Sequence, residues 1–150
     1  DAFIQLGYCH SDISIGVNTK TNGKKLSEFL RQNEKNVVNF YDNDDTIVQE
    51  SDGIKIYTYW RMKGLENKMV ILHNFCTWKT KDEDGRWVYY EEDLLKRIQF
   101  VGCTRAREKL YIYFDRFSNT KSRYSRGFIP NNECSIINTI PRELYDREEI

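Results

Sequence analysis

RIQFVGCTRAREKLYIYFD, residues 97–115, joins an amphipathic run to a strand-like run. The first half belongs to a predicted helix over residues 91–108, and the second half predicts a strand over residues 109–115. The apolar residues of this helix recur three or four positions apart and fall on one face: Leu94, Leu95, Ile98 and Val101. A helix that leads directly into a strand is the connecting unit of an α/β fold.

The segments before this helix predict the rest of a sheet. Strands are predicted over residues 12–19, 36–42 and 53–60, and residues 68–75 form a nearly continuous apolar run, which is typical of a central strand in a parallel sheet. A helix that begins near Asn22 is predicted after the first strand, with an apolar stripe of Leu26, Phe29 and Leu30. The order β-α-β-β-β-α-β predicts a mostly parallel sheet flanked by helices. Asp84-Gly85 predicts a hairpin turn, and Pro141 predicts the start of a last short helix.

The composition is that of one globular domain. The 150 residues are 39% hydrophobic and 31% charged, which excludes a disordered segment. No apolar run approaches the roughly 20 residues that span a bilayer, and no secretory signal is present, so we expect a cytoplasmic protein without a membrane partner. The four cysteines form no CxxC pair and the two histidines complete no ligand spacing, which predicts free thiols and no metal site. The chain starts at Asp1, and we expect it to be a fragment of a longer chain.

Two motifs resemble those of a known motor family. IYTYWRMKGLENKMVIL, residues 56–72, resembles motif V of the UvrD/Rep-type superfamily 1 DNA helicases, typically T-x-H-x-x-K-G-L-E-F-x-x-V. RIQFVGCTRAREKLYI, residues 97–112, resembles motif VI, typically R-L-x-Y-V-[AG]-x-T-R-A-[RK]-x-x-L. The segments at residues 12–32 and 135–146 resemble the family's earlier strand and helix and its closing motif. The resemblance therefore covers most of the chain.

This resemblance implies a RecA-like domain of the P-loop NTPase type, the second of two in a motor. It implies a domain core over residues 1–115 and a C-terminal extension over residues 116–150 that packs on the core. In such motors ATP and Mg²⁺ lie between the two domains, and the first domain carries the Walker A loop and the Mg²⁺ ligands. This sequence has no Walker A match, so we expect an N-terminal RecA-like domain of the same protein as partner. Only 20 positions separate Asn33 from Gly53, too few for the large helical subdomain that the best-known members insert there.

The resemblance also implies four ATP-binding residues. Arg105, in the TRA of motif VI, corresponds to the catalytic arginine finger, whose planar, permanently charged guanidinium stabilises charge on phosphoryl oxygens. Glu66, in KGLE, matches a residue that contacts the ribose, and Gly64 would bring backbone amides near the nucleotide. Lys20 replaces the usual arginine at the end of the first strand and would face a phosphate.

Three further residues are expected to contact DNA. Thr58 and Lys63 match motif V positions that would contact phosphates of single-stranded or partly duplex DNA. Trp60 replaces the usual histidine and offers an indole on which a base can stack.

Each of these assignments has a plain structural alternative. Arg105 could instead form an ion pair with Glu91 or Glu108, and the Glu66 carboxylate could cap nearby backbone N–H groups. Trp60 could be a core or interdomain aromatic, and Lys20 a solvated lysine.

The sequence therefore predicts the C-terminal motor domain of an ATP-dependent DNA helicase or translocase. The family translocates 3′-to-5′ on single-stranded DNA, and this part of the motor alone would not hydrolyse ATP. Substitutions at Trp60, Asn67 and Lys20 keep a second hypothesis open, a catalytically degenerate module that serves as a nucleic-acid-binding subunit or scaffold. A third hypothesis is an unrelated parallel α/β binding domain, which predicts that Glu66 and Arg105 lie on opposite faces.

Overall fold

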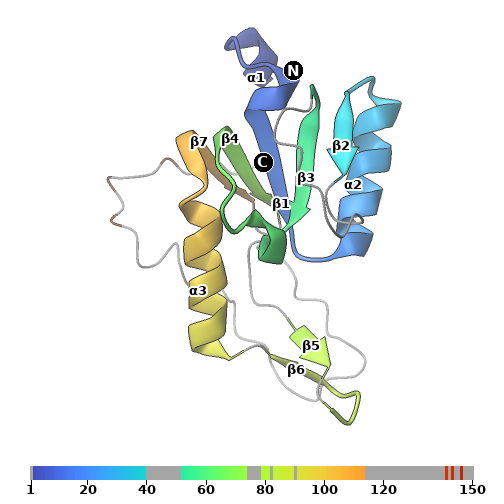
Figure 1. The fold of residues 1–150 in the computed structure, drawn as a ribbon, viewed down its shortest axis with the longest axis vertical. Helices are drawn as coiled ribbons and strands as arrows, with labels where there is room; N and C mark the ends of the chain where they lie inside the picture. Colours follow the sequence, from blue (N-terminus) through green and yellow to red (C-terminus); the bar gives the residue numbers. More distant parts are fainter. Residues whose placement is uncertain are drawn as a thin grey trace.

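The protein contains a five-stranded parallel sheet (Figure 1). The computed structural model describes residues 2–39, 52–73, 79–81, 83–89 and 91–113, together with residues 141, 143 and 146. The strands in these ranges are β1 Ile13–Val17, β2 Val37–Asn39, β3 Ile54–Thr58, β4 Asn67–His73 and β7 Ala106–Tyr113. Their order in the sheet is β2-β3-β1-β4-β7, and every neighbouring pair runs parallel. The predicted α/β class with a mostly parallel sheet is confirmed.

Helices cover both faces of this sheet. They are α1 Ala2–Gln5, α2 Lys20–Gln32 and α3 Glu92–Cys103, and the short 3₁₀ turns are η1 His10–Asp12 and η2 Tyr59–Met62. The side chains of α2, with Leu26 and Leu30, pack on a core cluster that includes Ile15 and Ile56. The side chains of η2 and α3 pack on a second cluster on the other face, because alternate residues of a strand point to opposite faces.

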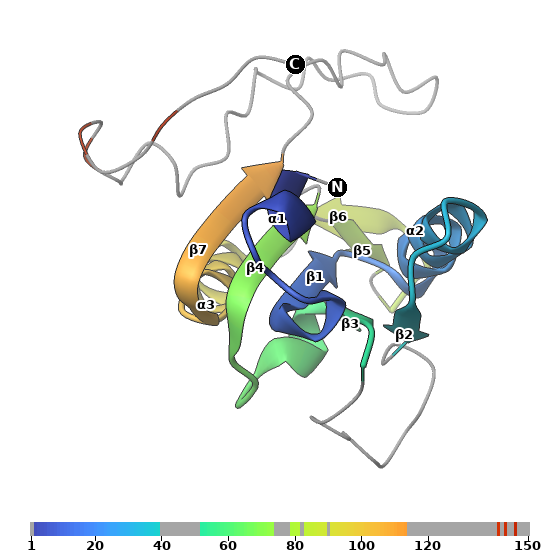
Figure 2. The same cartoon turned by 90° about the horizontal axis from the view of Figure 1, so that it is seen from above.

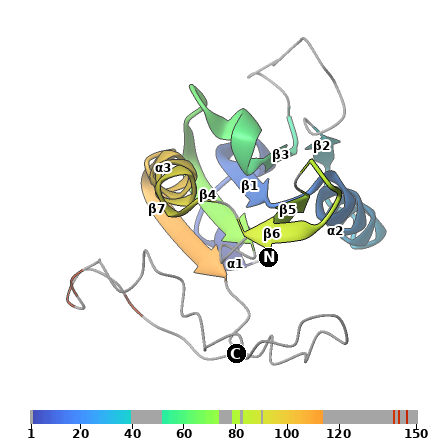
Figure 3. The ribbon, with the colours of Figure 1, turned by 90° about the horizontal axis from the view of Figure 1, so that it is seen from below.

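All five strands begin at one end of the sheet, the amino edge, and finish at the other end, the carboxyl edge. Different elements surround these two edges. Figure 2 looks down on the amino ends of the strands, where α1 lies. Figure 3 looks at the carboxyl ends, where an antiparallel hairpin lies, formed by β5 Lys79–Lys81 and β6 Trp87–Tyr89. This hairpin turns at Gly85, which has a φ of 76°, so the turn predicted at Asp84-Gly85 is confirmed.

Several predicted boundaries were wrong. The helix predicted to run to Glu108 ends at Cys103, and β7 begins at Ala106, so Thr104 and Arg105 of the TRA motif form the turn between them. The cap of α2 is Thr19, whose Oγ1 accepts a hydrogen bond from the Asn22 backbone N–H at 3.1 Å. Phe29, predicted in the buried stripe, is 59% exposed. The helix expected to start at Pro141, and the packing of residues 116–150, fall almost entirely outside the described residues.

Gly16 lets η2 lie directly on the sheet. A Cβ built on Gly16 would come within 2.7 Å of both Met62 Sδ and Tyr59 Cε1. Both of those side chains are almost fully buried, so neither has solvent-filled space into which to move. The absence of a side chain at this position therefore sets the distance between β1 and the turn that connects β3 to β4.

Gly16→Ala is therefore expected to destabilise the fold by about 1–3 kcal/mol, the usual cost of overpacking a core. Urea denaturation measures the free energy of unfolding directly. A Met62→Ala background removes one of the two close contacts and leaves space into which Tyr59 can shift, so the same substitution should cost clearly less there. Equal costs in both backgrounds would contradict the proposed steric contact.

Candidate functional site

The sheet brings the KGLE and TRA motifs together at its amino edge. KGLE leads into β4, TRA leads into β7, and these two strands are parallel neighbours. Asn67, which follows Glu66, donates its backbone N–H to the Arg105 carbonyl at 3.0 Å, and Asn67 pairs with Ala106 in the ladder. Two motifs that are 40 positions apart in the sequence therefore meet at one place, as a shared site requires. This arrangement is the opposite of the one that the unrelated-domain hypothesis predicts.

Arg105 is held against the C-terminal end of α3. Its Nε donates to the Val101 carbonyl at 2.9 Å and its Nη2 donates to Thr104 Oγ1 at 2.9 Å. Thr104 Oγ1 in turn donates to the carbonyl of Phe100 or Val101, at 3.0 and 3.1 Å. A guanidinium suits this place because the last carbonyls of a helix carry partial negative charge. Two of its five N–H donors have partners in the described part of the chain.

The two ion pairs considered for Arg105 are not observed. Glu108 instead accepts a hydrogen bond from Tyr8 Oη at 3.1 Å, and Arg105 has no carboxylate partner among the residues that the structure describes. The side chain is half-buried, and its remaining donors are available for an anion.

Gly64 and Glu66 lie in the exposed loop that leads into β4. Gly64 has a φ of 82°, a left-handed conformation that favours glycine, and no atom lies within 4 Å of where its Cβ would be. Glu66 is exposed, and its carboxylate has no hydrogen bond or ion pair with the described residues. The capping role considered for Glu66 is therefore not observed, and both residues leave an open approach to the loop.

Lys20, Thr58 and Trp60 lie at the opposite, carboxyl edge. Thr58 ends β3 and pairs with Val17, the last residue of β1, while Lys20 begins α2. Trp60 is 48% exposed, so it is not the core aromatic considered above. The structure thus groups Lys20 with two predicted DNA-binding residues, and it does not bring Lys20 together with Arg105. A five-residue strand, roughly 16 Å long, separates these edges.

Lys63 lies between the two edges. It follows η2, which starts at the carboxyl end of β3, and it precedes the loop that returns to the amino end of β4. Its side chain is exposed. The chain from Trp60 to Glu66 therefore crosses one face of the sheet in seven residues and connects the two groups of predicted site residues.

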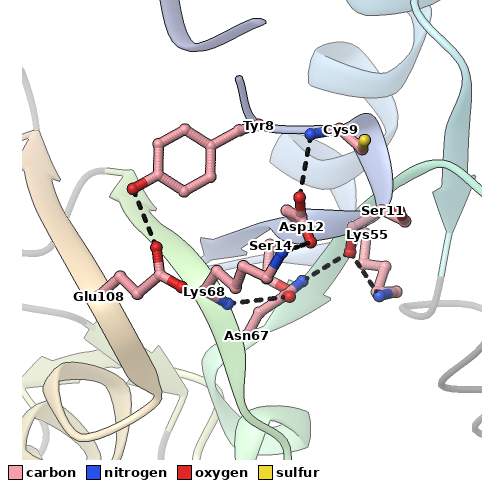
Figure 4. Close-up of polar contacts among 9 residues, drawn as sticks. All are labelled: Tyr8, Cys9, Ser11, Asp12, Ser14, Lys55, Asn67, Lys68 and Glu108. Carbon is pink, nitrogen blue, oxygen red and sulfur yellow. Dashed lines mark hydrogen bonds and ion pairs between the residues drawn. The ribbon is translucent and has the colours of Figure 1, made fainter. Parts of the chain in front are cut away.

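A polar network surrounds the amino edge (Figure 4). It joins the segment before β1 to the starts of β3, β4 and β7. Lys68 Nζ forms an ion pair with Asp12 Oδ1 at 3.0 Å, and Asp12 Oδ2 accepts the Cys9 backbone N–H at 3.0 Å. Lys55 Nζ donates to the Ser11 carbonyl at 2.8 Å. Apart from the unusual Asn67, no local pattern indicates this network, because its members lie on four separate segments.

Asp12 and Cys103 have pKa values shifted in opposite directions, for different reasons. The Cys9 N–H and the Lys68 ammonium stabilise the charged carboxylate and hold the pKa of Asp12 below its ordinary value. Burial raises the pKa of the Cys103 thiol to about 11, so it stays protonated at neutral pH and is a poor nucleophile. Cys9 and Cys103 are both free thiols, while the other two cysteines lie outside the described residues.

The described residues contain no group of three or more His, Cys, Asp or Glu side chains that could hold a metal ion. In the same part of the chain, every helix is too short or too polar to cross a membrane.

The fold is similar to a domain of known structure. No family model and no curated protein matches the sequence. Among solved structures, the chain is similar to the C-terminal domain of a possible DNA helicase from Lactobacillus plantarum WCFS1, with a TM-score of 0.52 and 17% sequence identity. The match covers 75% of this chain and 60% of that chain. At this identity the likeness shows the fold alone.

The Asp12–Lys68 pair predicts a pH dependence of stability. Because the folded state lowers the pKa of Asp12, its carboxylate stabilises the fold above the unfolded pKa, and this contribution is lost as the pH falls below about 4. Asp12→Asn should therefore lower the free energy of unfolding at pH 7, and the difference from the wild type should shrink in acid. Urea denaturation at pH 7, 4 and 3 measures the difference in the free energy of unfolding between the wild type and Asp12→Asn.

Asp84→Asn provides the matched control. Asp84 and Arg86 form an ion pair at 3.8 Å whose side chains are 73% and 78% exposed, and such pairs contribute little. A difference that stays constant from pH 7 to pH 3 for Asp12→Asn would contradict the assigned role of the carboxylate.

Proposed function

We propose that this domain is the C-terminal motor domain of an ATP-dependent DNA helicase or translocase of the UvrD/Rep type. The observation that carries the proposal is the meeting of KGLE and TRA at one edge of the sheet, joined by the Asn67–Arg105 backbone hydrogen bond. The motifs lie on a fold similar to that of a possible DNA helicase C-terminal domain. ATP and Mg²⁺ would bind in a partner RecA-like domain, because this sequence lacks a Walker A loop.

Three features of the amino edge fit a nucleotide phosphate and ribose. Arg105 keeps unused guanidinium donors, Glu66 presents a carboxylate without a described partner, and Gly64 leaves its backbone open. In the proposed mechanism the partner domain closes on this edge, and Arg105 leaves Thr104 to stabilise charge on the transferring phosphoryl group. Glu66 accepts hydrogen bonds from the ribose hydroxyls. The phosphoryl chemistry is supplied by the bound nucleotide and its metal ion.

The carboxyl edge is proposed to grip single-stranded DNA. Lys20 at this edge and Lys63 on the segment that leaves it supply exposed ammonium groups for phosphates, and Trp60 presents its indole for base stacking. Thr58 is only 8% exposed, so its hydroxyl would reach a phosphate only after the neighbouring chain moves. We assign Lys20 to this edge because it follows β1 there, away from Arg105. Domain closure at the amino edge then displaces the loop from η2 to β4, which carries Lys63, and so moves the grip on the strand.

The degenerate-module hypothesis loses one of its supports. Asn67 was one of three departures from the family pattern that favoured it, but its side chain makes three hydrogen bonds within the domain. A residue with that many internal contacts has a structural reason to differ from the family. The other two departures still favour it, because Trp60 keeps an aromatic ring but loses the second nitrogen of histidine, and Lys20 keeps the cation but lacks the planar fork of arginine.

Arg105→Ala in the full-length protein is expected to lower DNA-stimulated ATP hydrolysis by about 10³-fold or more, as in motors where an arginine finger has been removed. Arg107→Ala is the matched control, because Arg107 is exposed and only two positions away. Steady-state ATPase assays, with thermal melting to verify folding, make the measurement. Activity of Arg105→Ala within about threefold of the wild type would exclude the finger assignment.

Trp60→Ala is expected to weaken binding of single-stranded DNA by about 1–3 kcal/mol, the usual contribution of one stacked base. Phe29→Ala, which removes another exposed aromatic, should leave affinity unchanged.

Lys63→Ala should reduce the slope of log affinity against log salt by about 0.7, because one phosphate contact is lost. Fluorescence anisotropy over a salt series measures both, and equal losses for Trp60→Ala and Phe29→Ala would refute the stacking role.

A further inference from the structure

Asn67, which follows the KGLE motif, forms hydrogen bonds through both its backbone and its side chain. Its backbone N–H donates to the Arg105 carbonyl at 3.0 Å, and its Oδ1 accepts the Lys68 N–H at 3.0 Å. Its Nδ2 donates to the Ser11 carbonyl at 3.1 Å and to Ser14 Oγ at 2.9 Å (Figure 4). Both hydrogens of the side-chain amide are used, so its orientation is fixed.

The ladder between β4 and β7 contains a β-bulge just after the point where Asn67 bonds to Arg105. Asn67 pairs with Ala106, whereas Met69 pairs with Lys109, so β7 has one residue more than β4 between these two pairs. A bulge of this kind interrupts the regular ladder and bends the strand that carries the extra residue. Arg105 lies just beyond the last ladder pair. Its carbonyl is fixed across the sheet by the Asn67 N–H, and its own N–H bonds back to Gly102 at 3.2 Å.

The Asn67 side chain is in turn anchored to rigid parts of the domain. Ser14 lies in the central strand β1 and is 5% exposed. The Ser11 carbonyl also accepts a hydrogen bond from Lys55, a mostly buried residue of β3. The amide therefore connects the start of β4 to the starts of two inner strands. Without it, the residues before Met69 would be joined to β1 only through the β4 ladder, which begins at Met69–Ile13, and through the Lys68–Asp12 ion pair.

We propose that Asn67 is a positioning residue for the nucleotide site, which fixes Arg105 relative to the core of the domain. This inference rests on the proposed function. An arginine finger acts only if its guanidinium reaches the phosphoryl group when the domains close, and a misplacement of about 1 Å can lower a rate about 10²-fold. The motif V pattern has an aromatic residue at this position, and an aromatic ring could not make these side-chain hydrogen bonds.

The test measures DNA-stimulated ATP hydrolysis by the full-length protein. Asn67→Ala should lower kcat about tenfold or more, with KM for ATP within about twofold, because the finger contributes in the transition state. In an Arg105→Ala background, the same substitution should lower the residual single-turnover rate no further. A side chain that only stabilises the fold would not show this dependence on Arg105.

Asn36→Ala is the matched control. The Asn36 side chain also joins two loops at the amino edge, since its Nδ2 donates to the Asp52 carbonyl at 3.0 Å, but it lies beside β2, on the other side of the sheet. The kcat of the Asn36→Ala variant should equal that of the wild type. If Asn67→Ala does not fold by thermal melting, Ser14→Ala, which removes one of the two amide acceptors, should lower kcat by a smaller factor that also disappears without Arg105.

The outcomes separate this inference from the proposed function. Suppose that Arg105→Ala loses activity, and that Asn67→Ala or Ser14→Ala has the same effect in the wild type and in the Arg105→Ala background. This result would overturn the positioning role and leave the proposed function standing. An unchanged kcat in folded Asn67→Ala would overturn the positioning role as well. Full activity of Arg105→Ala would overturn both.

Discussion

Because neighbouring strands of the main sheet all run in one direction, their starts meet at one edge and their ends meet at the other. Each connection between parallel strands must therefore cross a face of the sheet, and the crossings in the described residues are α2 on one face and η2 and α3 on the other. The position of every candidate residue follows from this constraint. Residues that precede a strand gather at the amino edge, and residues that follow a strand gather at the carboxyl edge.

The same constraint separates the two chemistries of the proposed motor. Arg105 and Glu66 precede strands and face the proposed nucleotide, whereas Thr58 and Trp60 follow a strand or end it and face the proposed DNA. The chain from Trp60 to Glu66 is the short path between the two edges. Gly16 keeps that path close to the sheet, because any side chain there would displace Tyr59 and Met62. A displacement at one edge can therefore reach the other through packed residues.

Hydrophobic periodicity predicted the helices and strands of the sheet but not their ends. The helix α3 was extended over the TRA motif because Arg, Ala and Glu are good helix formers. In the folded chain Thr104 closes the helix through its Oγ1, and pairing with β4 draws Ala106 into a strand. Phe29 fits the spacing of a buried stripe, yet α2 covers the sheet with Leu26 and Leu30, and Phe29 is left at the surface.

The sequence by itself determined the α/β class and the two motifs, because both depend on residues that are close together along the chain. Only the tertiary structure decided that Lys20 lies away from Arg105, that Asn67 joins β4 to β1, and that Lys68 pairs with Asp12. Contacts of this kind join residues far apart in the sequence, and the hydrogen bond from Tyr8 to Glu108 spans 100 positions. Strand order and register fix such contacts, and both are set by how the whole chain buries its apolar surface, which no local pattern records.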